Sequence, residues 1–235
     1  MKRIKMILIK FNLRIVLWVN KIKKMTKDKN VTMEEKYDYL HGIIKTVVDG
    51  SKVELKCYGL ENLPEEQGYL ITPNHQGLFD ALALLSTHPK PMTAVVKQEL
   101  ADAKIVGDVI KFLDALPIDR SNLRASMKVI KEVTKRLENG VNFVIFPEGT
   151  RCKQGNKMLE FKGGTFKSVI DAKKPIVPVA LIDCYKAFDE DSKEPMTAQI
   201  HYLKPMYYDE YKDMTSVEVA KEVQSRIQKC IDEMA

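Results

Sequence analysis

The 235-residue chain lacks the features that mark several classes of protein. Its four cysteines (Cys57, Cys152, Cys184 and Cys230) include no close pair, so the sequence encodes neither a disulfide framework nor a zinc site. Eleven glycines and ten prolines show no internal period, which excludes collagen-like, low-complexity and repeat architectures. The composition, 45% apolar and 30% charged, predicts a folded chain of one large domain, with or without a small appendage. Free thiols suit a reducing compartment.

Negative charge is nearly missing from the N-terminus. The formal net charge of the chain is +6, but residues 1–30 hold ten Lys or Arg against a single acid, Asp28. The remaining 205 residues hold 28 bases and 31 acids. A basic N-terminal segment therefore precedes a nearly neutral body.

Residues 4–25 carry the pattern of an amphipathic helix. Apolar side chains recur at steps of three and four residues, which places them on one helical face. This apolar stripe consists of Ile4, Ile7, Leu8, Phe11, Ile15, Trp18, Ile22 and Met25. The opposite side carries Lys2, Lys5, Lys10, Lys21, Lys23 and Lys24, interrupted by Ile9, Leu13, Val16 and Leu17.

This segment fits neither a transmembrane helix nor a signal peptide. A spanning helix needs about 20 mostly apolar residues, whereas the longest apolar run here covers only residues 15–19. Residues 20–24 are too basic for a small-residue cleavage site. We expect instead a helix in the membrane interface, where each lysine contributes on the order of 1 kcal/mol at an anionic surface. The side chains expected in the acyl chains are Ile4, Leu8, Phe11, Ile15, Trp18 and Ile22.

Two alternatives to membrane binding remain for this helix. It can dock on the core of the protein itself, or it can bind nucleic acid. Nucleic acid is disfavoured because the apolar residues form one stripe rather than spaced stacking platforms. A second amphipathic helix, whose start carries the capping-box pair Thr32 and Glu35, is acidic, so we expect it to pack on the first helix or the core.

From residue 51 onward, short β-rich runs alternate with helical patterns. This alternation predicts an α/β fold with a mixed, largely parallel sheet flanked by helices. Strands are predicted over residues 53–58, 69–72, 92–96, 116–118, 142–146, 176–181 and 198–203. Helices are predicted over residues 79–86, 100–113, 123–138, 165–172 and 215–234. The polar, acidic segment 186–195 is predicted to be a surface loop.

The first candidate site is a histidine followed five positions later by a carboxylate, His75 and Asp80. On a continuous helix the two side chains would point apart, so they meet only if His75 lies in a loop and Asp80 in the first helical turn. The carboxylate can then hold one ring nitrogen and leave the other as an acceptor, as a general base requires. The purely structural alternative is a first-turn acid that is stabilised by the helix dipole.

A second candidate site follows the predicted strand 142–146. Gly149 lets backbone amides approach a ligand closely, and Arg151 suits forked recognition of a phosphate. The segment Phe161-Lys162-Gly163-Gly164 then opens another helix, a second natural anion cradle. The structural alternative is a strand exit with a salt-bridged arginine.

Four blocks of the sequence resemble, in order, those of the glycerolipid acyltransferases, and most closely the 1-acyl-sn-glycerol-3-phosphate acyltransferases. They cover about residues 50–205. The blocks are Asn74-His75 with Asp80; Lys97 through Gly107 to Ile118-Asp119-Arg120; Phe146-Pro147-Glu148-Gly149-Thr150-Arg151; and Ile176-Val177-Pro178-Val179-Ala180. The resemblance implies an acyltransferase domain, residues 49–235, preceded by a membrane-binding two-helix element, residues 1–48.

The resemblance also implies roles for individual residues. His75 is then the general base and Asp80 the carboxylate that orients it. Gly77 stands where the family often has serine, and this substitution should loosen the turn without removing the catalytic pair. The residues implied to bind the phosphate of the acceptor are Glu148, Gly149, Thr150, Arg151, Arg120, Lys97 and Lys162.

The implied reaction transfers a fatty acyl group from acyl-CoA or acyl-carrier protein to the sn-2 hydroxyl of lysophosphatidic acid, giving phosphatidic acid. We expect no cofactor, no metal and no nucleic acid, and a peripheral (monotopic) protein on the cytoplasmic face of a cell membrane, of bacterial origin. Three alternatives stay open. The acceptor can be glycerol 3-phosphate or another lysophospholipid, Cys152 can carry the acyl group covalently, or the chain can be a non-catalytic lipid-binding protein.

Overall fold

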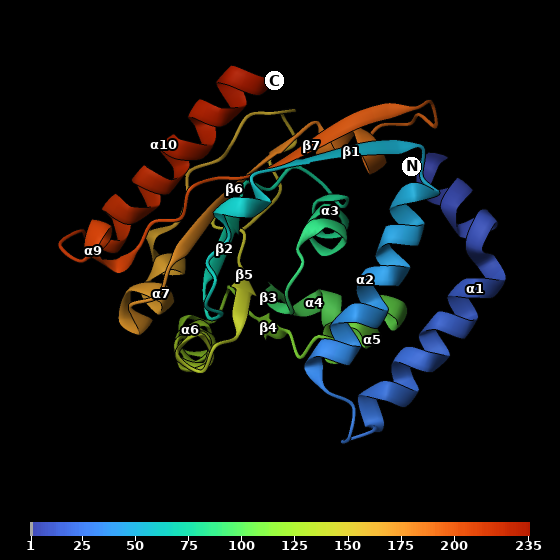
Figure 1. Cartoon of the computed structure of the whole chain (residues 1–235), viewed down its shortest axis with the longest axis horizontal. Helices are drawn as coiled ribbons and strands as arrows, with labels where there is room; N and C mark the ends of the chain where they lie inside the picture. The colour runs from blue at the N-terminus through green and yellow to red at the C-terminus, as the bar shows by residue number, and fades with distance from the viewer. Residues whose placement is uncertain (1) are drawn as a thin grey trace.

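Seven strands form one sheet in a computed structural model that describes residues 2–235 (Figure 1). Their spatial order is β1-β7-β6-β2-β5-β3-β4, and every neighbouring pair is parallel except β6 with β7. The strands are β1 (Val53–Tyr58), β2 (Leu70–Pro73), β3 (Met92–Lys97), β4 (Leu116–Ile118), β5 (Asn142–Val144), β6 (Ile176–Ile182) and β7 (Met196–Tyr202). The prediction of a mixed, largely parallel sheet is confirmed, with strand boundaries within two residues.

Helices cover both faces of this sheet (Figure 1). Two hydrophobic clusters lie on opposite sides: one is covered by α1, α2, α3 and α5, and the other by α6, α7 and α10. The helices are α1 (Lys2–Lys27), α2 (Met33–Asp49), α3 (Asp80–Thr87), α4 (Gln98–Ala101), α5 (Lys104–Phe112), α6 (Leu123–Glu138), α7 (Lys167–Ala172), α8 (Cys184–Phe188), α9 (Tyr208–Tyr211) and α10 (Ser216–Met234), with 3-10 turns at Leu60–Asn62 and Gly163–Phe166.

Two local predictions differ from the structure. The single helix expected over residues 100–113 is broken into α4 and α5, because Ala103 takes an extended conformation and Gly107 packs against the carbonyl of Ala101, where a Cβ would lie 2.3 Å from the oxygen. The segment 186–195, expected to be a surface loop, begins inside α8. Its first carbonyl groups accept hydrogen bonds from Arg3 of α1, so this segment is partly structural.

The apolar stripe of α1 faces the protein, which contradicts the expectation that it faces lipid. Phe11 and Ile22 are buried in the same hydrophobic cluster as the sheet, and Ile4, Ile15 and Trp18 pack against that cluster. Phe11 lies directly on the end of α2, where a Cβ on Gly50 would lie 2.5 Å from the phenyl ring. Of the six residues assigned to lipid, only Leu8 is exposed, at 49%. The physical reason is that the stripe covers the apolar surface of α2, α5 and the sheet, so docking on the core is the arrangement found.

The face of α1 that points away from the core is also apolar, but it is formed by a different set of residues from the stripe that is buried. Ile9, Leu13, Val16 and Leu17 are between 58% and 77% exposed and share one helical face. Several lysines of α1 bind the protein: Lys23 pairs with Asp108 of α5 at 3.4 Å, and Lys21 lies 4.3 Å from the centre of the Tyr39 ring. No helix within residues 2–235 is long and apolar enough to span a membrane.

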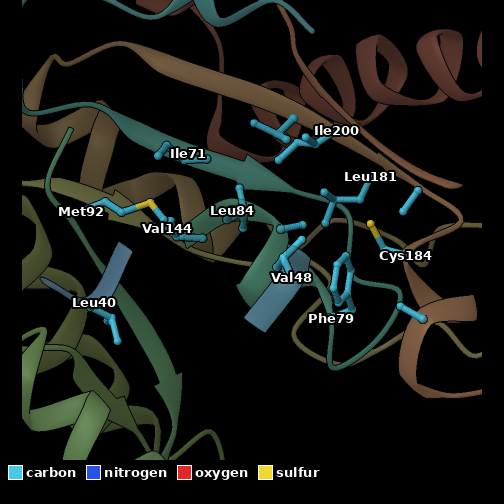
Figure 2. Packing of buried hydrophobic residues seen from close by; sticks show 14 of the residues in the cluster. Leu40, Val48, Ile71, Phe79, Leu84, Met92, Val144, Leu181, Cys184 and Ile200 are labelled. Carbon is cyan, nitrogen blue, oxygen red and sulfur yellow. The ribbon is translucent and has the colours of Figure 1, made fainter. Parts of the chain in front are cut away.

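Residues of α2 and α3 form part of the buried cluster on one face of the sheet (Figure 2). Leu40 and Val48 of α2 and Leu84 of α3 belong to the same buried cluster as the strand residues Ile71 and Val144 (Figure 2). These side chains are almost fully excluded from water, and burial of each contributes about 1.5–3 kcal/mol. The packing fixes the start of α3, and therefore Asp80, relative to the end of β2.

Candidate active site

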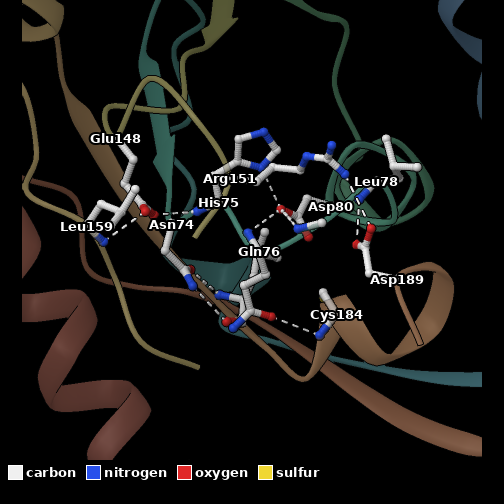
Figure 3. A network of polar contacts seen from close by, with 12 residues as sticks. Asn74, His75, Gln76, Leu78, Asp80, Glu148, Arg151, Leu159, Cys184 and Asp189 are labelled. Atoms are coloured by element: carbon white, nitrogen blue, oxygen red, sulfur yellow. Dashed lines mark hydrogen bonds and ion pairs between the residues drawn. The ribbon is translucent and has the colours of Figure 1, made fainter. Parts of the chain in front are cut away.

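His75 lies in the connection between β2 and α3, at the carboxyl edge of the sheet, where open α/β folds place their sites. The residue before it anchors this connection. The side-chain amide of Asn74 accepts a hydrogen bond from the Leu181 N–H at 2.7 Å and donates one to the Leu181 carbonyl at 3.0 Å (Figure 3). Because β6 is a buried strand, this two-point attachment holds the histidine loop against a rigid part of the fold.

The histidine and the carboxylate meet as predicted. His75 Nδ1 lies 2.7 Å from Asp80 Oδ2, with His75 in the loop and Asp80 at the first position of α3 (Figure 3). The same Asp80 oxygen accepts the N–H groups of Gln76 at 2.7 Å and Gly77 at 2.9 Å. His75 therefore donates from Nδ1, and its Nε2, which has no partner within residues 2–235, carries the lone pair that a general base needs.

The Asp80 carboxylate is buried, but it has hydrogen-bond partners. Its side chain is 0% exposed, and this burial raises the pKa of the carboxyl group, while the hydrogen bonds from His75 and from two backbone amides act in the opposite direction. The His75 side chain is 23% exposed, and its ring stacks on Phe146 with the ring centres 4.1 Å apart. The pair thus has one solvent-excluded member that orients and one accessible member that can react.

Glu148 holds the histidine loop from the other side. Its carboxylate accepts the His75 N–H at 2.6 Å and the Leu159 N–H at 2.9 Å, and the residue is 2% exposed (Figure 3). Burial raises the pKa of Glu148 against these two amide hydrogen bonds. In this structure both carboxylate oxygens of Glu148 accept backbone N–H groups, so the residue supports the histidine loop, and its contact with a phosphate stays a prediction.

The turn at Gly149 has two of the predicted cations on or beside it and leads to Cys152, whose N–H donates to the His75 carbonyl at 2.8 Å. Gly149 has φ +74°, which favours glycine, and Lys162 Nζ lies 3.0 Å from the place that a Cβ at this position would take. Arg151 lines a cavity of about 380 Å³ together with Gln76, Lys153, Tyr185, Asp189 and Glu190. Thr150 is exposed on the same turn. Of the predicted phosphate-binding residues, Gly149 and Lys162 are thus close together, and Arg151 lies two residues farther along the same turn.

Lys97 and Arg120 lie at the same edge of the sheet but farther along it. Lys97 ends β3 and Arg120 follows β4, and the strand order places both beyond β5 as seen from His75. Lys97 Nζ pairs with Glu99 at 2.8 Å, and Arg120 is exposed. The structure shows no contact of either side chain with His75 or Arg151 among residues 2–235.

The other chemistries considered find less support in the geometry. The Cys152 side chain is 2% exposed, and its backbone N–H donates to the His75 carbonyl at 2.8 Å, so the residue braces the loop. Within residues 2–235, no three His, Cys, Asp or Glu side chains are close enough to hold a metal ion. A larger open hollow of about 590 Å³ along α10 is lined by none of the predicted site residues.

Two residues of the site were not predicted. Gln76 links three segments, since its Oε1 accepts the Cys184 N–H at 2.9 Å and its Nε2 donates to Asn156 Oδ1 at 2.8 Å. Asp189 pairs with Arg151 at 3.3 Å. Both partners lie far away in sequence, so no local spacing could have indicated these contacts.

A buried carboxylate that is hydrogen-bonded to a partly exposed histidine, at the carboxyl edge of an α/β sheet, is an arrangement typical of enzymes that use general acid–base catalysis. A sequence profile of the Acyltransferase family matches residues 54–182. The chain belongs to the acyltransferase family.

Named relatives agree with this family. The chain is 31% identical over 160 residues to the 1-acyl-sn-glycerol-3-phosphate acyltransferase of Helicobacter pylori, covering 68% of this chain and 67% of that protein. It is 33% identical over 172 residues to the human 1-acyl-sn-glycerol-3-phosphate acyltransferase alpha, covering 72% of this chain but 56% of the human protein.

The fold also resembles a crystal structure, that of the 1-acyl-sn-glycerophosphate (LPA) acyltransferase of Thermotoga maritima. The TM-score is 0.77 at 20% identity, over 100% of this chain and 98% of the other. The similarity therefore includes the N-terminal helices as well as the sheet.

Proposed function

We propose that this enzyme transfers a fatty acyl group from an acyl thioester to the sn-2 hydroxyl of lysophosphatidic acid, giving phosphatidic acid for phospholipid synthesis. The observation that carries the proposal is the His75–Asp80 pair, held at 2.7 Å beside the turn that contains Gly149 and Arg151. The names of the relatives from Helicobacter pylori and human supply the acceptor.

The acceptor binds through its phosphate in this mechanism. Arg151 and Lys162 supply the positive charge, and Lys162 Nζ can lie this close to the turn because Gly149 has no side chain. Fixing the phosphate places the sn-2 hydroxyl near Nε2 of His75. Holding the two reactants in this way removes much of the entropic part of the barrier.

His75 acts as the general base. Nε2 takes the hydroxyl proton while the alcohol oxygen attacks the thioester carbon, and the ionised Asp80 stabilises the imidazolium that forms. Collapse of the tetrahedral intermediate breaks the carbon–sulfur bond. The thiolate of the donor then takes the proton from Nε2, so that the products are the ester and a free thiol.

Product analysis tests this proposal. Wild-type enzyme and His75→Ala would be incubated with lipid vesicles, lysophosphatidic acid and either acyl-CoA or acyl-carrier protein, and the lipids would be measured by mass spectrometry. We expect phosphatidic acid from the wild type with at least one donor, and a loss of about 10²- to 10⁴-fold in the variant. Parallel reactions with glycerol 3-phosphate and lysophosphatidylcholine identify a different acceptor. No product with any pair of substrates contradicts the proposal.

We also propose that the enzyme binds the membrane surface through the outward face of α1. Ile9, Leu13 and Leu17 lie on that face and are 67% to 77% exposed. An apolar helix face flanked by lysines is the pattern of an interfacial helix. This surface replaces the stripe named from the sequence, because that stripe is occupied by the core.

Two matched sets of substitutions separate the two faces of α1. The triple variant Ile9→Gln, Leu13→Gln, Leu17→Gln should lose sedimentation with anionic vesicles while keeping its thermal stability. Phe11→Ala should instead lose about 3–5 kcal/mol of stability, because it opens a cavity in the core. Unchanged sedimentation of the triple variant would contradict the membrane proposal. Deletion of residues 1–24 is less informative, since it removes core side chains together with the surface.

A further inference from the structure

Asp189 connects two parts of the candidate active site. It is the first residue after α8, and its two carboxylate oxygens have different partners (Figure 3). Oδ1 lies 3.3 Å from Arg151 NH1, and Oδ2 accepts the backbone N–H of Leu78 at 3.3 Å. One side chain therefore contacts both the arginine assigned to the phosphate and the loop that carries His75.

Gly77 leaves room for this carboxylate. A Cβ at position 77 would lie 2.2 Å from Asp189 Oδ2, closer than non-bonded atoms can approach, and 3.2 Å from the Cα of Tyr185. A side chain at position 77 must therefore displace the Asp189 carboxylate or the first turn of α8.

The segment that carries Asp189 is hydrogen-bonded to Arg3 of α1. Arg3 is 1% exposed, and its guanidinium donates to the carbonyl groups of Lys186 at 3.2 Å and Ala187 at 2.7 Å, and to that of Glu194. These three carbonyls flank Asp189 on both sides in sequence. A buried arginine that satisfies three carbonyls holds the backbone of this segment in one position.

We propose that Asp189 is a positioning residue that aims Arg151 at the phosphate of the acceptor, and that it requires glycine at position 77. The inference rests on the proposed function and deepens it by naming what orients the phosphate-binding arginine. The guanidinium has five N–H donors, so pairing of NH1 with Asp189 leaves the other donors for the ligand. A carboxylate next to an arginine also fixes the plane of the guanidinium, which sets the direction of a forked contact.

Kinetic constants separate positioning from catalysis. Asp189→Asn should raise KM for lysophosphatidic acid about three- to tenfold while kcat changes less than threefold, because the substitution weakens ground-state and transition-state binding equally. Asp209→Asn on α9 is the matched control, since that acid is exposed and pairs only with Lys212 within the described chain. An unchanged KM in Asp189→Asn, or a fall in kcat alone, would overturn the proposal.

The relation between Asp189 and position 77 is tested by a double variant. Gly77→Ala should raise KM as Asp189→Ala does, because the added methyl group displaces the carboxylate. The double variant Gly77→Ala, Asp189→Ala should be no worse than Asp189→Ala alone, since the carboxylate is then gone and only the milder 3.2 Å approach to the Cα of Tyr185 remains. Independent, multiplicative effects of the two substitutions would overturn the requirement for glycine.

A chemical readout keeps this inference separate from the proposed function. Phenylglyoxal reacts with arginine side chains, and peptide mass spectrometry gives its rate at Arg151 alone. The rate should rise about three- to tenfold in Asp189→Ala and in Gly77→Ala, and should stay unchanged in Asp209→Asn, whether or not the enzyme forms phosphatidic acid. Equal rates in all variants would overturn the positioning role even if the wild type makes phosphatidic acid.

Discussion

Two histidines bracket the same short helix, and their surroundings differ completely. His75 precedes α3, and His88 caps its carboxyl end by donating its backbone N–H to the Leu84 carbonyl at 2.9 Å. His75 is 23% exposed and pairs with a carboxylate. His88 is 0% exposed, and its ring nitrogens contact the hydroxyl of Tyr69 at 2.9 Å and the carbonyl of Lys90 at 2.7 Å.

The two histidines differ in how their ring nitrogens are used. Because a carbonyl can only accept, His88 must donate from Nδ1, and its Nε2 then accepts from Tyr69, so both ring nitrogens are used. Burial lowers the pKa of His88 to about 4, which keeps the ring neutral at neutral pH. His75 also donates from Nδ1, but to a carboxylate, and its Nε2 faces the accessible side.

Of the substitutions that test this difference between the two histidines, the one at Asp80 should have the largest effect on kcat. Asp80→Asn removes the negative charge that stabilises the imidazolium of His75, so kcat should fall about 10²- to 10⁴-fold. The melting temperature and the far-ultraviolet circular dichroism of the variant serve as controls for folding. A folded variant that keeps more than a tenth of wild-type kcat would contradict the role of Asp80.

A smaller effect should come from the support behind His75. Glu148→Gln places an amide N–H₂ against one of two backbone N–H donors, so one buried group loses its partner at a cost of about 1–3 kcal/mol of stability. The displaced loop should also lower kcat about tenfold. Urea unfolding and steady-state kinetics measure the two effects. If stability and kcat are both unchanged, Glu148 does not hold the loop.

The smallest effect on activity should come from His88, whose substitution changes the pH dependence of stability instead. Its folded pKa lies below the unfolded value of about 6.5, so the unfolded state binds more protons and stability falls as pH drops from about 6.5 toward 4. Between pH 7 and pH 5 this group accounts for a loss of about 2 kcal/mol.

His88→Gln should therefore flatten the fall in stability below pH 6.5 by about 2 kcal/mol and change kcat less than twofold. Urea unfolding at pH 7 and pH 5, with wild type as the reference, measures the first quantity. An unchanged slope would show that His88 is not held neutral. A large fall in kcat would remove the contrast between the two histidines.

Local pattern was enough to predict much of the site. His75 and Asp80 lie on one short turn, so their spacing allowed the pair to be predicted, while the phosphate-binding residues were implied by the family resemblance. The carboxyl ends of parallel strands β2 and β5 then bring these two segments together. The sheet could also be predicted from local pattern, because strand-like and helix-like segments alternate along the sequence.

Other features depend on tertiary contacts and could not be predicted from the sequence. The periodicity of α1 shows two apolar faces but not which of them meets the core, and Phe11 and Ile22 settle against α2 and the sheet only in the fold. Asp189 meets Arg151 across 38 positions, and Arg3 reaches Ala187 across 184. Contacts at such separations leave no periodic signature in one sequence.

The most direct test of the central claim is a double-mutant cycle on the catalytic pair. The values of kcat for His75→Ala, Asp80→Asn and the variant with both substitutions would be compared with wild type under one set of vesicle and substrate conditions. If Asp80 acts only through His75, the double variant should lose no more activity than His75→Ala alone, because the two residues work as one unit. Losses that multiply would contradict the account.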